Sequence, residues 1–149
     1  MEYISRNPHF KKDLLEKMQL NHFMQHLGLQ VTAVEAGYIE AELVLQKIHL
    51  QQNGFVHGGI TSTIADIVMG FAAYSLVAQG EGTVTSDLKI AYLRPGTGDK
   101  IIARGKVIKP GNQLYYCESD VLCLHPEKGE ILIARGYSTM CAVKHPVVR

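Results

Sequence analysis

One short stretch of the sequence combines residue types that could stabilise a developing negative charge. It reads Asn-Gly-Phe-Val-His-Gly-Gly over residues 53–59, and it opens a long apolar segment that contains one acidic residue, Asp66. Two adjacent glycines at the start of a helix let another molecule approach the backbone closely. The unpaired N–H groups and the positive dipole end of such a helix favour negative charge. The stretch around Gly58 and Gly59 therefore predicts a site for a developing oxyanion.

Asp66 is the residue in this segment that most needs an explanation. It lies among the aliphatic side chains of residues 64–68, and a buried carboxylate costs several kcal/mol unless it is paired or protonated. Catalysis would explain it; a hydrogen bond to the backbone of another element or a position at a wet edge is the structural alternative. For Gly58 and Gly59 the alternative is tight packing against a strand, and for His57 it is a helix cap or a satisfied core histidine. The combination favours catalysis.

The segment that carries Asp66 predicts a long helix. Between Ile60 and Gln79 only Asp66 is charged, and about 20 residues at 1.5 Å each would give a helix of roughly 30 Å. Because apolar residues fall on every side of it, we expect this helix to be enclosed.

Six runs of residues predict strands that could enclose it. Two precede the helix and four follow it, at residues 29–34, 38–45, 83–93, 100–109, 113–124 and 130–143. The short turns between the later runs favour an antiparallel meander. An amphipathic helix from about Pro8 to Gln25, ended by Gly28, comes first. The expected fold class is α+β, a curved antiparallel sheet of about six strands wrapped around one long central helix.

Composition narrows the class of protein further. With 149 residues, 46% of them hydrophobic, and a net charge of +1, the chain predicts a single domain over residues 1–149, with residues 1–27 as a helical extension. Scattered basic residues argue against nucleic acid as a partner. The three cysteines lack a C-x-x-C spacing, so we expect reduced thiols and no metal. Neither a membrane span nor a secretory signal is evident, which predicts a cytoplasmic protein without a membrane partner.

The order and spacing of these motifs resemble a known family. His57-Gly58-Gly59, an aspartate nine residues after the histidine, and a following strand that runs from Thr85 to Tyr92-Leu-Arg-Pro95 are similar to the hotdog-fold acyl-CoA thioesterases, specifically the phenylacetate-degradation thioesterase-like branch. The resemblance covers roughly residues 28–143. It implies a hotdog fold, subunits paired edge to edge into homodimers and commonly homotetramers, active sites at the subunit interface, and no cofactor.

The resemblance also implies roles for individual residues. Asp66 matches the general base or nucleophile, the N–H of Gly58 matches the group that polarises the thioester carbonyl, and Thr85 matches a residue that positions the water or the carboxylate. The family often has asparagine six residues before the histidine, where this sequence has Gln51. The candidates for that side chain are Gln51, Gln52 and Asn53.

Helix geometry predicts a homodimer independently of the family. Asp66 lies eight residues after Gly58, about 12 Å along a helix axis, whereas a reacting carbonyl must sit about 3 Å from both its oxyanion donor and its attacking group. If the site is catalytic, Asp66 of one subunit must therefore meet the helix start of another, in two equivalent sites.

The predicted function is hydrolysis of an acyl-CoA thioester. The catalytic candidates are Asp66, Gly58, His57, Gln51 and Thr85. The substrate-binding candidates are Asn53, Gly59 and Phe55, with Arg94 and Lys109 for the CoA phosphates.

Two alternatives stay open. A hotdog hydratase or dehydratase acting on enoyl or hydroxyacyl thioesters would need a histidine–carboxylate pair, and only His57 is available near the site. A non-catalytic acyl-CoA-binding protein would gain little from a buried Asp66 beside a neutral carbonyl.

Overall fold

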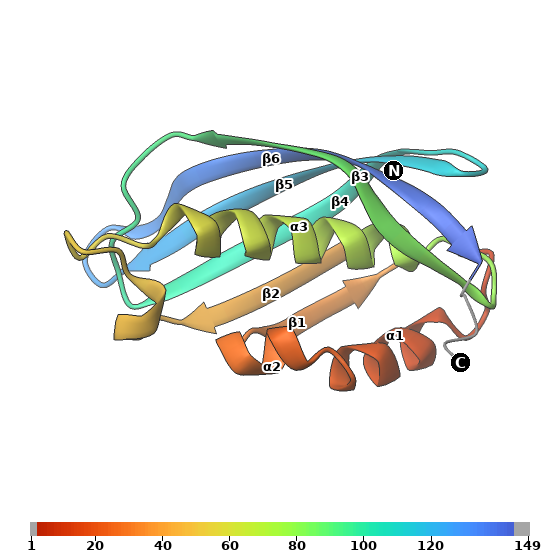
Figure 1. The fold of residues 1–149 in the computed structure, drawn as a ribbon, viewed down its shortest axis with the longest axis horizontal. Helices are drawn as coiled ribbons and strands as arrows, with labels where there is room; N and C mark the ends of the chain where they lie inside the picture. The colour runs from red at the N-terminus through yellow and green to blue at the C-terminus, as the bar shows by residue number, and fades with distance from the viewer. Residues whose placement is uncertain (1–2, 145–149) are drawn as a thin grey trace.

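A six-stranded antiparallel sheet curls around helix α3 in the computed structural model, which describes residues 3–144 (Figure 1). The sheet order is β1-β2-β4-β5-β6-β3. In chain order the helices and strands are α1 (Phe10–Gln19), α2 (His22–Leu27), β1 (Gln30–Glu35), β2 (Tyr38–Val44), η1 (Lys47–His49), α3 (Gly58–Tyr74), β3 (Glu81–Tyr92), β4 (Lys100–Pro110), β5 (Leu114–His125) and β6 (Gly129–Lys144). The predicted fold class is confirmed.

Helix α3 fits closely against the sheet because strand β4 has a glycine, Gly105, at the point of closest approach. A Cβ atom on Gly105 of β4 would lie 2.5 Å from the backbone carbon of Val68, so only glycine allows this approach. The helix buries one stripe of residues: Thr61, Ile64, Ala65, Val68, Met69, Ala72, Ala73 and Tyr74.

The prediction that this helix is enclosed on every side is wrong for the single chain. The stripe that contains Ser62, Asp66, Ile67, Gly70 and Phe71 is only half-buried. The sheet covers one side of α3, and the apolar composition of the other side reflects groove walls rather than a closed core.

The meander prediction holds for β4, β5 and β6 but is wrong for β3. Strand β3 pairs with β6, at the far edge of the sheet from β1. Its link to β4 crosses the end of the sheet: Leu93 and Arg94 both donate backbone hydrogen bonds to the carbonyl of Ile133, at 2.8 and 3.1 Å. The turn residues at 94–99 predicted that the chain reverses, but they carry no information about which strand lies next to β3.

Strand β3 changes face at a bulge. The register shifts between Thr85 and Asp87, so that Thr85 pairs with buried Met140 and Leu88 pairs with buried Ser138. Side chains normally alternate between faces with a period of two. Because Ser86 is the extra residue, Thr85 and Leu88 both point toward α3 although they are three positions apart.

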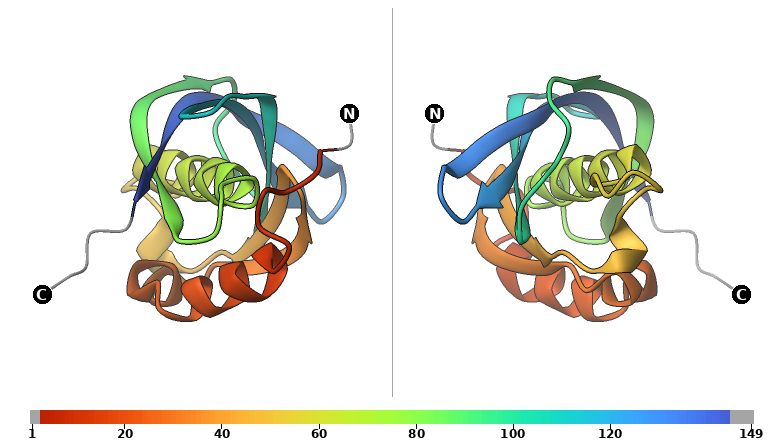
Figure 2. Two further views of the ribbon diagram at one scale, coloured as in Figure 1. Left: turned by 90° about the vertical axis from the view of Figure 1, so that its right-hand side faces the viewer. Right: turned by 90° about the vertical axis from the view of Figure 1, so that its left-hand side faces the viewer.

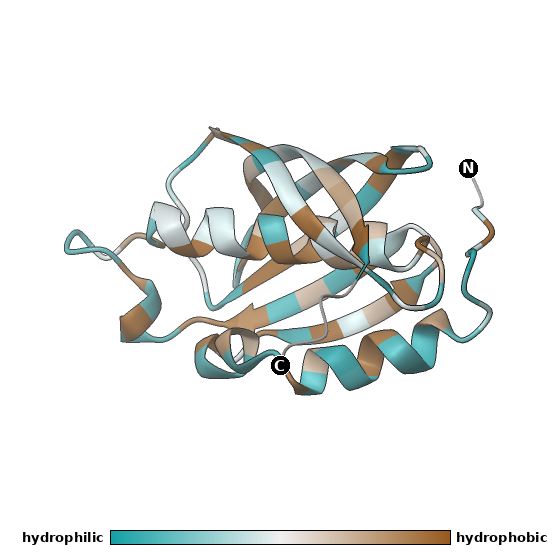
Figure 3. Cartoon of the chain, turned by 45° about the vertical axis from the view of Figure 1, so that its right-hand side comes forward, coloured by the Kyte–Doolittle hydropathy of each residue, from teal (hydrophilic) through white to brown (hydrophobic). Residues whose placement is uncertain are grey.

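The N-terminal segment forms two helices rather than the single predicted one. Asn21 interrupts the helical pattern because its side-chain oxygen accepts a hydrogen bond from the Met24 N–H at 3.0 Å and so starts α2. Gly28, in the left-handed region at φ +80°, ends α2 as predicted. Both helices lie beside the β1 edge (Figure 2), where α1 adds Leu14 and Met18 to the core and α2 adds Met24. Their ribbons are mostly hydrophilic in composition (Figure 3), with Leu15 and Phe23 as exposed apolar residues.

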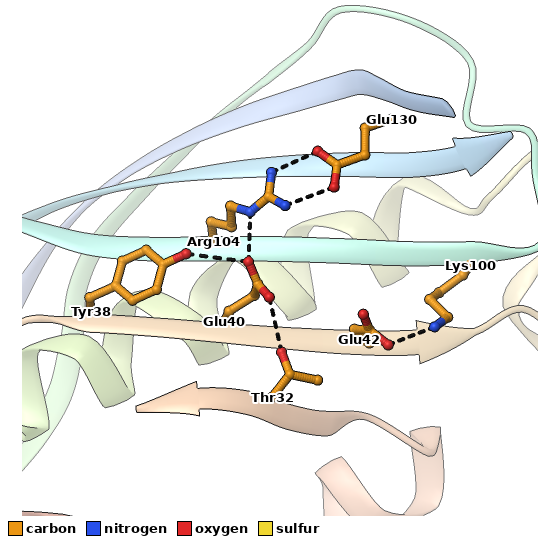
Figure 4. A network of polar contacts seen from close by, with 7 residues as sticks. All are labelled: Thr32, Tyr38, Glu40, Glu42, Lys100, Arg104 and Glu130. Atoms are coloured by element: carbon orange, nitrogen blue, oxygen red, sulfur yellow. Dashed lines mark hydrogen bonds and ion pairs between the residues drawn. The ribbon is translucent and has the colours of Figure 1, made fainter. Parts of the chain in front are cut away.

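The outer face of the sheet carries ion pairs (Figure 4). Arg104 donates to Glu40 at 2.7 Å and to both oxygens of Glu130 at 2.8 Å, while Tyr38 and Thr32 donate to Glu40. None of the helices within residues 3–144 is long and apolar enough to cross a membrane. The three thiols are free, and burial raises the pKa of Cys117 to about 12 and that of Cys123 to about 11.

Candidate active site

His57 is the N-cap of α3, and it fixes which backbone amides at the helix start are available. Its Nδ1 accepts a hydrogen bond from the Gly59 N–H at 2.8 Å, so this ring nitrogen carries no proton. The N–H of Gly58 has no acceptor among the described residues 3–144. A free amide at a helix start suits a ligand that gains negative charge. The Gly58 N–H is thus free to donate to a ligand, whereas the Gly59 N–H already donates to His57.

A buried histidine outside the predicted set holds this helix start in place. His49 is 1% exposed, its Nδ1 accepts from the Gln46 N–H at 3.0 Å, and its Nε2 is 3.0 Å from the Leu27 carbonyl oxygen. Its own carbonyl accepts the His57 N–H at 2.9 Å. Sequence reasoning missed His49 because a single histidine in a polar loop has no periodicity that marks it as buried.

The loop before α3 settles where the three candidate amide side chains lie. The Gln51 side-chain oxygen accepts the Asn53 N–H at 2.6 Å, and the Gln51 backbone N–H donates to Phe55 at 2.8 Å. Gly54, at φ +83°, forms the turn between Gln51 and Phe55. Gln52 and Asn53 are exposed at its tip. Of the three, Gln51 lines the pocket at the helix start.

The pocket at the helix start, the first of two pockets in the candidate site, has a volume of about 400 Å³. It lies between the end of β3 and the start of α3. Tyr92 Oη donates to the Gly58 carbonyl oxygen at 2.9 Å, and the Arg94 guanidinium donates to the Leu132 carbonyl at 2.9 Å. Predicted substrate-binding residues Phe55 and Arg94 both line this pocket. Lys109 does not: it lies near the far end of β4, where it pairs with Tyr116. The sequence alone does not show at which end of the sheet a basic residue such as Lys109 lies.

Asp66 lines a second pocket, between α3 and the first half of β3. Thr85 Oγ1 donates a hydrogen bond to Asp66 Oδ1 at 2.7 Å, so the strand that follows the helix holds the carboxylate. The pocket has a volume of about 360 Å³, and its apolar walls include Ile67, Phe71 and Met140. Asp66 is half-buried rather than fully enclosed, which leaves it accessible to a substrate.

Comparison with known proteins places this geometry in a family. The family model described as "Thioesterase superfamily" matches residues 53–130, the range that holds the helix start, Asp66 and Thr85. The chain belongs to the thioesterase superfamily. It is 30% identical over 121 residues to human acyl-coenzyme A thioesterase 13, covering 79% of this chain and 83% of that protein. It is 28% identical over 109 residues to the proofreading thioesterase EntH of Klebsiella pneumoniae, covering 73% and 77%.

Solved structures agree with this placement. A thioesterase family protein from Silicibacter pomeroyi superimposes with a TM-score of 0.88 at 26% identity, covering 91% of this chain and 99% of that one. The PaaI protein of Escherichia coli, from the phenylacetic acid degradation operon, superimposes with a TM-score of 0.77 at 22% identity, covering 91% and 94%, and supports the fold. The predicted family and hotdog fold are confirmed, and thioester hydrolysis is the reaction class that this family membership supports.

In one chain of this thioesterase the two halves of the candidate site are apart. Gly58 lines the first pocket and Asp66 the second, and eight residues of helix between them correspond to about 12 Å. Strand β3 connects the pockets, because Thr85 contacts Asp66 near its start and Tyr92 contacts Gly58 at its end. Along β3, the apolar side chains of Val84, Leu88 and Tyr92 are 51%, 40% and 57% exposed.

Proposed function

We propose that this thioesterase hydrolyses acyl-CoA thioesters, with Asp66 as general base or nucleophile. The observation that carries the proposal is the hydrogen bond from Thr85 to Asp66 in a pocket with apolar walls. The Thr85 hydroxyl fixes the position of the carboxylate, and a carboxylate oxygen is a group that can accept a proton from water or attack a carbonyl. The pocket beside it offers an apolar surface for an acyl group.

The chemistry needs three groups. As water attacks the thioester carbonyl, Asp66 accepts its proton; alternatively the carboxylate attacks first, and water then hydrolyses the mixed anhydride. The free N–H of Gly58 at the start of α3 stabilises the charge that collects on the carbonyl oxygen. The carbon–sulfur bond breaks, the CoA thiolate leaves and takes up a proton, and the free acid remains.

We further propose that Asp66 works with Gly58 of the partner subunit. Edge strand β3 has a free side, since among residues 3–144 it pairs only with β6, and its exposed apolar side chains suit an interface. If two copies pair β3 with β3 in antiparallel fashion, the start of one strand lies beside the end of the other. Such pairing centred between Thr85 and Tyr92 brings Asp66 toward the partner's helix start and forms two equivalent sites.

The test uses purified protein, a panel of acyl-CoA substrates and a thiol reagent that detects released CoA. Asp66→Asn and Asp66→Ala are expected to lower kcat by about 100- to 10,000-fold without changing the oligomer measured by sedimentation. Asp87→Asn is the matched control, because Asp87 is an exposed aspartate on β3, close in sequence to Thr85, and pairs with Thr139 on the other face of the sheet. Unchanged turnover in both Asp66 variants would remove Asp66 from the mechanism.

The same samples separate the alternative functions. A hydratase would change the absorbance of an enoyl-CoA without releasing thiol. A non-catalytic binding protein would leave bound acyl-CoA intact after prolonged incubation. Either result, together with the absence of thiol release, contradicts the proposed hydrolysis.

A further inference from the structure

The Asp66 pocket continues along α3 as a groove that reaches the N-terminal helices. From Asp66 and Thr85 it runs between α3 and β3 past Ile67, Phe71 and Val84, and it ends at Tyr74 and at Lys17 of α1. Gly70 keeps the middle of the groove open, since a Cβ atom there would meet only the Met140 methyl carbon, at 3.9 Å. The α3 wall of the groove is thus mainly apolar, the β3 wall adds the hydroxyl of Thr83, which donates to the Gly70 carbonyl at 3.0 Å, and each end has a charged side chain.

The far end carries a cation, Lys17, without a carboxylate partner among residues 3–144. Lys17 Nζ lies 5.4 Å from the centre of the Tyr74 ring, and it forms no ion pair with any of residues 3–144. Asp13, one turn earlier on α1, is held instead by the Asn7 side chain at 2.8 Å. The ammonium can thus bind an anion while it keeps its contact with the aromatic ring.

The spacing between the two ends sets the length of a ligand that would use both. Tyr74 is eight residues after Asp66 on the same helix, which corresponds to about 12 Å along the axis. An acyl group whose carbonyl reacts at Asp66 would extend along Ile67 and Phe71, and its far end would reach the Lys17 ammonium. A medium-length chain spans this distance.

We propose that the groove selects acyl groups that end in a carboxylate, so that the substrate is the CoA monothioester of a dicarboxylic acid. This inference rests on the proposed function and specifies its substrate class. Lys17 lies in α1, outside residues 53–130 that match the family model. The N-terminal extension therefore supplies the specificity-determining group, while the family's common part supplies Asp66 and Thr85.

The test compares suberyl-CoA with octanoyl-CoA, which differ chiefly in the terminal carboxylate. Binding is measured by calorimetry with non-hydrolysable thioether analogues, and turnover is measured as thiol release. The native protein is expected to prefer the suberyl compounds, and Lys17→Met is expected to lower that preference about 2- to 5-fold, as for one partly exposed charge pair. Lys17→Arg, which keeps the charge, is expected to retain the preference.

A second variant tests whether the acyl chain occupies the groove at all. Gly70→Leu places a side chain in its open middle and is expected to weaken binding of both analogues. The inference is overturned if Lys17→Met leaves the suberyl-to-octanoyl ratio unchanged, if octanoyl compounds are preferred by the native protein, or if Gly70→Leu weakens neither analogue. Lys17-dependent binding of the suberyl analogue without thiol release supports the inference and contradicts the proposed hydrolysis.

Discussion

The hydroxyl of Tyr92 donates a hydrogen bond to the carbonyl oxygen of Gly58 at 2.9 Å, which ties the last residue of β3 to the first residue of α3. A Cβ atom on Gly58 would lie 3.4 Å from the same tyrosine ring. The strand that carries Thr85 at one end thus orients the proposed oxyanion peptide at its other end. Any displacement of β3 would disturb both halves of the candidate site.

This contact gives a prediction for Tyr92→Phe, which removes only the hydroxyl. We expect kcat/KM to fall about 2- to 10-fold, because a hydrogen bond of this kind contributes about 0.5–1.5 kcal/mol and because Gly58 loses part of its orientation. The measurement is thiol release from an acyl-CoA. Tyr116→Phe is the control, since Tyr116 is exposed on β5. Equal effects of the two variants would show that the Tyr92 hydroxyl has no role in catalysis.

The His57 cap gives a second prediction. His57→Ala should lower the free energy of unfolding by about 0.5–2 kcal/mol and also lower kcat, because the Gly59 N–H loses its acceptor at the start of α3. His57→Asn should retain more of the stability and more of kcat than His57→Ala, because asparagine is a favoured N-cap residue. Urea denaturation and thiol release measure the two effects. His9→Ala is the control: His9 occupies the N-cap of α1 without a side-chain cap hydrogen bond, and a loss as large there would argue against the capping explanation.

The ion pairs on the outer face of the sheet predict how stability depends on pH. Hydrogen bonds from Arg104 lower the pKa values of Glu40 and Glu130 below the ordinary value of 4.5. Carboxylates with a lowered pKa stabilise the fold above their unfolded pKa, and this contribution is lost as the pH falls from 4.5 through their folded values. All three side chains are partly exposed, so the loss should be at most about 1 kcal/mol.

The check is urea denaturation at neutral and acidic pH. Arg104→Gln should reduce stability at neutral pH and flatten its decline toward acidic pH. Lys12→Gln is the control, since Lys12 and Glu16 form an exposed pair with a separation of 3.9 Å. An unchanged acid dependence in Arg104→Gln would assign the decline to other carboxylates.

Much of the fold could be predicted because its signals are local. Apolar alternation marked β2, whose Ile39, Ala41 and Leu43 are buried, and Gly28 marked the end of α2. The break at Asn21 was missed because its neighbours keep a helical apolar pattern on both sides. The place of β3 at the sheet edge was missed because strand order depends on packing at long range.

The candidate site also has features that the sequence could predict and features that it could not. The rise of a helix was enough to predict that Gly58 and Asp66 lie apart, and they line different pockets. The contact between Thr85 and Asp66 joins two elements, and only the family resemblance indicated Thr85. The part played by Lys17 had no signal in sequence, because a lysine on an amphipathic helix resembles every other solvated lysine until the groove beneath it is known.

The bulge at Ser86 shows that residue count matters in β3 as much as residue identity. Thr85 turns inward on one side of it and Leu88 on the other. A regular strand with the same sequence would contain all the functional side chains. Without the bulge, however, Thr85 and Leu88, three positions apart, would point to opposite faces of the sheet, so one of them would turn away from α3. Insertions and deletions in this segment are therefore more damaging than most replacements, and anyone who engineers it should hold its length constant.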